Sequence, residues 1–154
     1  MKSSKRTVLI VDDEEAIRNL VGAFLFRLGR GCMKASDGID ALLKMKQNEI
    51  GAVITDIKMP KMDGIELTAE ISKQYPEIPV MVMTGFTEEN TAEGAIAAGA
   101  REFIQKPFSV EEFTIRFNKM IRESQNVRQG NSEGGEEEDV QNLLGELEAA
   151  LIKT

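Results

Sequence analysis

Five short segments between residues 7 and 106 are predicted strands, because each is a brief, mostly aliphatic run bounded by polar or turn-forming residues. Thr7–Val11 (TVLIV) and Ala52–Thr55 (AVIT) show no polar alternation, which is typical of strands buried on both faces of a sheet. The other three segments are Cys32–Ala35, Val80–Thr84 and Glu102–Lys106.

The segments between these strands have the three- and four-residue spacing of a helix face. After Glu14 the apolar positions are Ile17, Leu20, Val21, Phe24 and Leu28, and Gly29 and Gly31 end this helix. Asp37 is a predicted N-cap for a helix over Gly38–Asn48, whose apolar residues are Ile39, Leu42, Leu43 and Met45. Further helices are predicted over Ile65–Tyr75, Thr91–Ala98 and from Ser109 to about Glu123.

Strands that alternate with helices predict an α/β domain with a parallel sheet covered on both faces. Right-handed crossovers then favour a doubly wound sheet. The first 123 residues hold this whole pattern, so most of the 154-residue chain is expected to form one domain.

The composition changes after residue 123. Residues 124–139 are polar and end in the acidic run Glu136–Asp139, which predicts a flexible linker. Residues 140–152 follow as a predicted short amphipathic helix with a coiled-coil-like spacing, its apolar positions being Val140, Leu144, Leu147 and Leu151. This helix is too short to be stable alone in water, so it either frays or packs on this domain, a second copy or a partner.

Charge and residue usage exclude several classes of function. The net charge of −7 is concentrated in residues 124–154, which carry seven acids and two bases, so the body has no broad basic surface for nucleic acid. The chain has no histidine and one cysteine, Cys32, which excludes histidine-based catalysis and an internal disulfide. No apolar stretch is long enough to span a membrane and no signal peptide is expected, so we predict a cytoplasmic protein.

The polar residues at the predicted strand ends are the candidates for chemistry, because ligands of open parallel sheets bind at the carboxyl ends of the strands. These residues are Asp12, Asp13, Asp56, Thr84 and Lys106. Individually each has a plain structural explanation: the acids can begin a helix or a turn, and the lysine can be an ordinary surface residue. Their joint occurrence at strand ends favours a site.

Three carboxylates with few cations nearby either raise a pKa or bind a metal ion. Oxygen ligands without histidine or cysteine favour Mg²⁺. A lysine and a threonine hydroxyl at the same edge suit the oxygens of a phosphoryl group, and one carboxylate can then act as the nucleophile that receives it.

The segments of sequence that contain these residues resemble the receiver domains of two-component response regulators. The matching segments are VDDEE (11–15), DIKMPKMDG (56–64), MTG (83–85) and AIAAGAREFIQKPF (95–108), and the resemblance covers residues 5–123. It implies the flavodoxin-like strand order 2-1-3-4-5 and a cis Lys106–Pro107 peptide bond.

Carried over position by position, the resemblance implies that Asp56 is the phosphoacceptor, and that Asp12, Asp13, Asp56 and the backbone carbonyl of Lys58 hold Mg²⁺. Thr84 and Lys106 would bind the phosphoryl group. Phe103 matches the aromatic residue that turns inward with Thr84 on activation, although many members have tyrosine there. The bulky side chains of Lys58 and Phe86 lead to the hypothesis of slow self-dephosphorylation.

The resemblance also implies partners: a sensor histidine kinase or histidine phosphotransfer protein as donor, and a downstream protein target. A homodimer through the receiver surface or the C-terminal helix is left open, and no contact with membrane or nucleic acid is expected. The chain is not expected to be an enzyme beyond catalysing its own phosphorylation and dephosphorylation.

Three alternatives to a stand-alone switch remain. The chain could be the receiver part of a longer regulator, since 31 residues after position 123 are too few for an ordinary output domain. It could be a receiver-like module that is no longer phosphorylated. It could also be an aspartate-nucleophile phosphatase, although the usual DxD motif is missing because Ile57 and Lys58 follow Asp56.

Overall fold

A computed structural model of the chain describes residues 7–85 and 91–129, except for the side chains of residues 91 and 126–129. Its centre is one parallel five-stranded sheet in the order β2-β1-β3-β4-β5, as predicted. The strands are β1 (Val8–Val11), β2 (Cys32–Ala35), β3 (Ala52–Asp56), β4 (Val80–Thr84) and β5 (Glu102–Gln105). All residues of the central strands β1, β3 and β4 are buried, which explains their uninterrupted hydrophobic runs.

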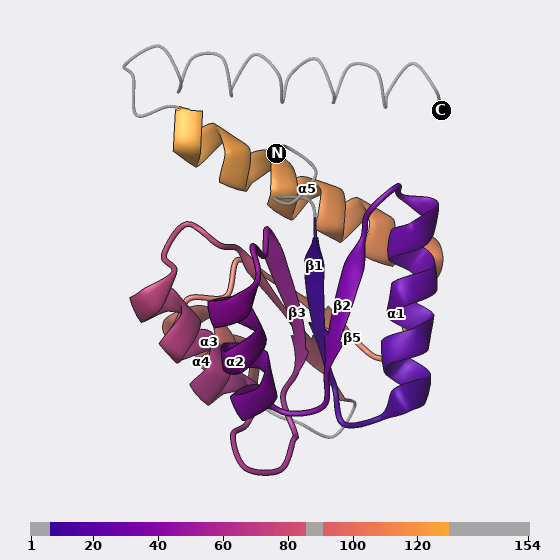
Figure 1. Cartoon of the computed structure of the whole chain (residues 1–154). Coiled ribbons are helices and arrows are strands. Elements are labelled where there is room, and N and C mark those ends of the chain that lie inside the picture. The colour runs from indigo at the N-terminus through magenta and orange to yellow at the C-terminus, as the bar shows by residue number, and fades with distance from the viewer. Residues whose placement is uncertain (1–6, 86–90, 130–154) are drawn as a thin grey trace, which may run out of the picture. The chain divides into compact units, whose positions relative to one another are not determined.

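Helices cover both faces of the sheet (Figure 1). They are α1 (Glu15–Arg27), α2 (Gly38–Gln47), α3 (Gly64–Gln74), α4 (Thr91–Ala98) and α5 (Val110–Gln129). Residues of α1 and α5 pack with one face, where Phe113 lies 5.5 Å from Phe24 and 5.7 Å from Phe117 between ring centroids. Residues of α2, α3 and α4 pack with the other face. The doubly wound arrangement is therefore confirmed.

Local side-chain contacts fix where the helices begin. The Asp37 carboxylate accepts a hydrogen bond from the amide of Asp40 at 2.8 Å, and so caps α2 as predicted. Asp63 and Glu66 form a reciprocal capping box at the start of α3. Within α2, the ammonium of Lys44 pairs with Asp40 at 2.9 Å and also donates to the main-chain oxygen of Lys34 in β2 at 2.6 Å.

The sequence overestimated the buried faces of two helices. Leu20 of α1 is 42% exposed, and Ile39 and Leu43 of α2 are 55% and 52% exposed. The buried apolar positions are Val21 and Leu25 in α1 and Ala41 and Met45 in α2, so Val21 and Met45 agree with the prediction and Leu25 and Ala41 were missed. A helix packed on a sheet buries only the residues that point at the sheet, and apolar residues on its flanks continue the helical spacing without reaching the core.

Helix α5 extends to Gln129, beyond the end predicted near Glu123 and into the segment expected to be a linker. Residues 122–129 contain neither glycine nor proline, so polarity alone does not end the helix, and Gly130 is the first breaker. The rest of the predicted linker and the predicted helix over residues 140–152 lie outside the described residues. In the described part, no helix is long and apolar enough to cross a membrane.

Candidate functional site

The register of the sheet brings the predicted site residues to one edge. Val11 is paired with Thr55, and Asp56 with Met83, so the ends of β1, β3 and β4 lie side by side. Asp12 follows β1, Asp56 ends β3 and Thr84 ends β4. The amide of Lys106 donates to the main-chain oxygen of Thr84 at 2.8 Å, which continues the ladder beyond β5. The Lys106–Pro107 peptide bond is cis, as the resemblance implied.

Lys106 lies between two buried carboxylates. Its Nζ atom is 3.1 Å from Oδ2 of Asp12 and 3.2 Å from Oδ1 of Asp56. The Asp12 side chain is fully buried and that of Asp56 is 10% exposed, so both ion pairs are largely shielded from solvent. The structure therefore joins three residues that the sequence places more than 40 positions apart.

The local main chain holds Asp12 in place. Its Oδ1 atom accepts a hydrogen bond from the amide of Glu14 at 2.8 Å, and its main-chain oxygen accepts one from Arg18 at 2.7 Å. Arg18 did not stand out in the sequence, because a basic residue in a helix that follows acids is common. Because Arg18 lies one turn into α1, its hydrogen bond to the main-chain oxygen of Asp12 connects the start of this helix to the residue after β1.

The pKa of the Asp56 carboxyl group is raised to about 6, chiefly by burial and then by the charge of Asp12, while Lys106 opposes the shift. The pKa of Asp12 is raised as well, chiefly by burial. Burial alone lowers the pKa of Lys106, but the charges of Asp56 and Asp12 outweigh burial and raise it. The site thus holds two carboxylates that are unfavourable in their charged form and a lysine that stays protonated.

Asp13 adds a third carboxylate to this group, and it is exposed. Carboxylate oxygens of Asp12, Asp13 and Asp56 lie within 4.8 Å of one another, which is close enough to share one cation. Hard oxygen ligands, an excess of negative charge and an opening to solvent at Asp13 fit Mg²⁺, which keeps part of its water shell. The donor set therefore fits the metal that the sequence predicts.

Thr84 and Phe103 lie on the same face of the sheet. Val82, two residues before Thr84, is paired with Phe103 across β4 and β5, and successive side chains alternate between faces. Phe103 is partly buried against the core on the α2, α3 and α4 side. Thr84 is 6% exposed.

Lys58 is exposed and lies two residues after Asp56, in the loop between β3 and α3. Phe86, the other residue in the hypothesis of slow self-dephosphorylation, lies outside the described residues.

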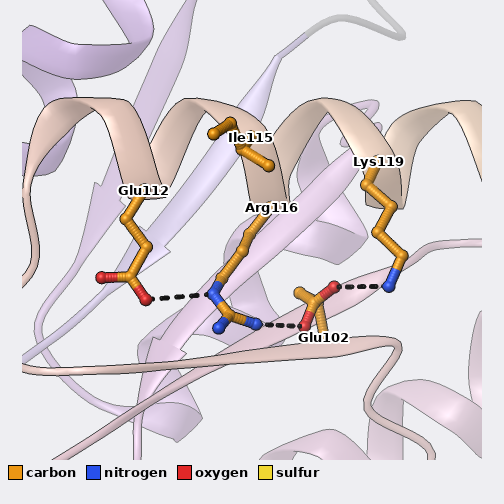
Figure 2. A pocket seen from close by; sticks show the side chains of 5 residues that line it. All are labelled: Glu102, Glu112, Ile115, Arg116 and Lys119. Atoms are coloured by element: carbon orange, nitrogen blue, oxygen red, sulfur yellow. Dashed lines mark hydrogen bonds and ion pairs between the residues drawn. The ribbon is translucent and has the colours of Figure 1, made fainter. Parts of the chain in front are cut away.

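A second charged cluster, which the sequence did not predict, surrounds Glu102 at the start of β5 (Figure 2). The Glu102 carboxylate is 3.1 Å from Arg116 and 3.7 Å from Lys119, and Arg116 also pairs with Glu112 at 3.2 Å. With Ile115, these residues line an open groove of about 480 Å³. The available signal was an acid at the first position of a short strand, together with two bases three residues apart on α5.

Residues 8–118 match the family model of the response regulator receiver domain. The alkaline phosphatase synthesis transcriptional regulatory protein PhoP of Bacillus subtilis is 31% identical over 142 residues, which cover 92% of this chain and 59% of that protein. An NtrX-like response regulator of Rickettsia conorii is 33% identical over 150 residues, which cover 96% of this chain and 32% of that protein. The chain thus spans less than two thirds of the length of these relatives.

Solved structures give the same result. The receiver domain of NtrX from Brucella abortus superposes with a TM-score of 0.72 at 35% identity, covering 75% of this chain and 98% of that one. The chemotaxis protein CheY4 of Vibrio cholerae gives a TM-score of 0.69 at 30% identity, covering 74% and 97% of the two chains. These matches span the sheet and the strand ends that carry the acidic cluster, and by them the chain belongs to the receiver domain family of two-component response regulators.

Proposed function

We propose that Asp56 of this receiver domain accepts a phosphoryl group from a phosphohistidine of a sensor kinase or phosphotransfer protein. The observation that carries the proposal is that Lys106 pairs with both Asp56 and Asp12 at the carboxyl ends of the strands. With a pKa of about 6, most of the Asp56 carboxyl group is ionised at neutral pH and can act as a nucleophile.

In this step an Asp56 oxygen attacks phosphorus. The new O–P bond forms as the P–N bond to the donor imidazole breaks, and the imidazole nitrogen keeps the electron pair. Asp12, Asp13, Asp56 and the main-chain carbonyl of Lys58 would hold Mg²⁺, which when bound supplies positive charge for the phosphoryl oxygens. Lys106, already 3.2 Å from Asp56, supplies a second positive charge from the protein itself.

The phosphoryl group on Asp56 then draws the Thr84 hydroxyl towards it, and Phe103 moves into the space that Thr84 leaves. Their position on one face of the sheet supports this coupling. The change is a shift between two arrangements that both exist beforehand, which phosphorylation biases towards one. It alters the binding of a downstream protein target. Phe103 has no hydroxyl group, so packing alone distinguishes its two positions.

The test is the intact mass of the chain after incubation with a small acyl phosphate and Mg²⁺. We expect one added phosphoryl group in the wild type and in Asp40→Asn, a control that neutralises an aspartate of α2. We expect none in Asp56→Asn, and none when Mg²⁺ is replaced by a chelator. Labelling that survives Asp56→Asn would disprove the assignment, and repeated turnover of a small phosphoester would favour the phosphatase alternative.

The predicted apolar positions of residues 140–152 motivate a second test. Deletion of residues 140–154 is expected to change the oligomeric state or partner affinity while leaving the labelling of Asp56 intact. Light scattering and a partner-binding assay measure these properties. Unchanged values of both would mean that this segment frays and takes no part in association.

A further inference from the structure

The loop that connects β3 to α3, residues 57–63, is closed tightly at its base. The amide of Gly64 donates to the main-chain oxygen of Ile57 at 2.7 Å. A Cβ atom on Gly64 would collide with the main-chain oxygen of Asp56, so only glycine allows this closure. The base of the loop is therefore fixed directly beside the proposed phosphoacceptor.

Met62, near the C-terminal end of the same loop, rests on the first residue of α2. A Cβ atom added to Gly38 would lie 2.9 Å from the Cβ, Cγ and Sδ atoms of Met62. A rotation of the Met62 side chain would not relieve this contact, because its Cβ atom is attached to the main chain of the loop. Gly38 thus allows the loop to approach α2 more closely than any other residue would.

Lys61, beside Met62, adds a second contact with the same turn. Its φ of 71° is in the left-handed region, which a non-glycine residue adopts only where surrounding contacts hold it. Its Nζ atom lies 3.6 Å from Oδ2 of Asp37, whose other oxygen caps α2. The Lys61 side chain is 68% exposed, so this ion pair adds little energy to the packing of the loop on α2.

Lys58 lies between Ile57 and Met62 in this loop, and its main-chain carbonyl is a metal ligand in the proposed function. We propose that Gly38 and Met62 are positioning residues for the divalent cation: their contact holds the loop so that the Lys58 carbonyl faces the carboxylates. The proposal rests on the proposed function, which assigns that carbonyl to the metal site. Contacts that orient metal ligands typically change metal affinity about 10–100-fold when they are lost.

The test is calorimetric titration of the full chain with Mg²⁺ alone, at a temperature where circular dichroism shows every variant to be folded. Gly38→Ala is expected to raise the Mg²⁺ dissociation constant about tenfold. Gly22→Ala is the matched control, because Gly22 is also helical and an added Cβ would have its nearest contact at 3.5 Å, an ordinary packing distance. Its dissociation constant should equal that of the wild type.

Met62→Ala provides an independent variant if Gly38→Ala does not fold. It removes the side chain that rests on Gly38 and is expected to weaken Mg²⁺ binding several-fold, whereas Met33→Ala, which removes a partly buried methionine of the same core from β2, should not. Unchanged affinity in Met62→Ala, or an equal loss in Met33→Ala, would overturn the positioning role. Absence of Mg²⁺ binding by the wild type would instead overturn the proposed metal site.

Discussion

Neutralising Asp56 should stabilise the metal-free protein at neutral pH. The pKa of its carboxyl group is about 6 in the folded chain and 3.8 for a solvated aspartate, a difference of about 2 units that is caused mainly by burial. Each unit corresponds to about 1.4 kcal/mol, so the charged form of Asp56 opposes folding by about 3 kcal/mol. With the side chain only 10% exposed, solvent screening reduces this value little. Asn has the shape of the carboxyl group without its charge, so Asp56→Asn should recover most of this unfolding free energy, about 3 kcal/mol.

The sign of the pH dependence follows from the raised pKa. Between about pH 4 and pH 6 the folded chain binds more protons at Asp56 than the unfolded chain, so this group makes stability fall as the pH rises. Below about pH 4 Asp56 is protonated in both states and has no such effect. Asp56→Asn should therefore exceed the wild type by about 3 kcal/mol near neutral pH and by little near pH 4.

The assay is urea unfolding followed by circular dichroism in a chelating buffer, for the wild type, Asp56→Asn and the control Asp40→Asn. Mg²⁺ should reduce the difference between wild type and Asp56→Asn, because a cation binds the charged carboxylate and stabilises the folded wild type. A variant no more stable than the wild type at neutral pH, or a difference that does not change with pH, would refute the reasoning that burial makes the Asp56 charge unfavourable.

Three further substitutions test other contacts, each by urea unfolding. Lys106→Met should lower the free energy of unfolding in chelator by about 3 kcal/mol, because Asp12 and Asp56 lose their shared cation. Mg²⁺ should restore part of this loss. An equal loss with and without Mg²⁺ would contradict the explanation. Gly64→Ala should destabilise by about 3 kcal/mol, since the main chain of Asp56 cannot move away, whereas Gly22→Ala should have little effect. Arg116→Ala should cost about 1–2 kcal/mol, because buried Glu102 then keeps only the Phe103 amide and the more distant Lys119 as described partners, and an unchanged stability would show that these suffice.

The strand order and the gathering of the acidic cluster could be predicted because they depend on features that a sequence displays directly. Uninterrupted aliphatic runs mark strands buried on both faces, and a parallel sheet brings the residues after each strand to one edge. The predicted meeting of Asp12, Asp56 and Lys106 is therefore confirmed by their distances. The assignment of chemical roles to them came from the resemblance and stays a prediction.

The sequence could not show contacts that depend on the angle at which elements pack. Leu20 and Val21 are neighbours of similar character, yet only Val21 faces the sheet. The close approach of Met62 to Gly38 could not be predicted either, because a glycine at the start of a helix and a methionine in a loop are both common. Helix α5 continued past Glu123 because polar residues are compatible with a helix, whereas the compositional change alone indicated a linker.

The cluster around Glu102 has a consequence for self-association. β5 is an outer strand, and the amide of Lys106 points towards β4, so by alternation the amide of Phe103 points away from the sheet. That outward amide donates to the Glu102 carboxylate at 3.2 Å, and Arg116 holds the same carboxylate. On the opposite outer strand, Lys44 occupies the main-chain oxygen of Lys34. Another extended chain would have to displace these charged side chains before it could pair with either outer strand of the sheet. This protects the domain from aggregation by strand addition.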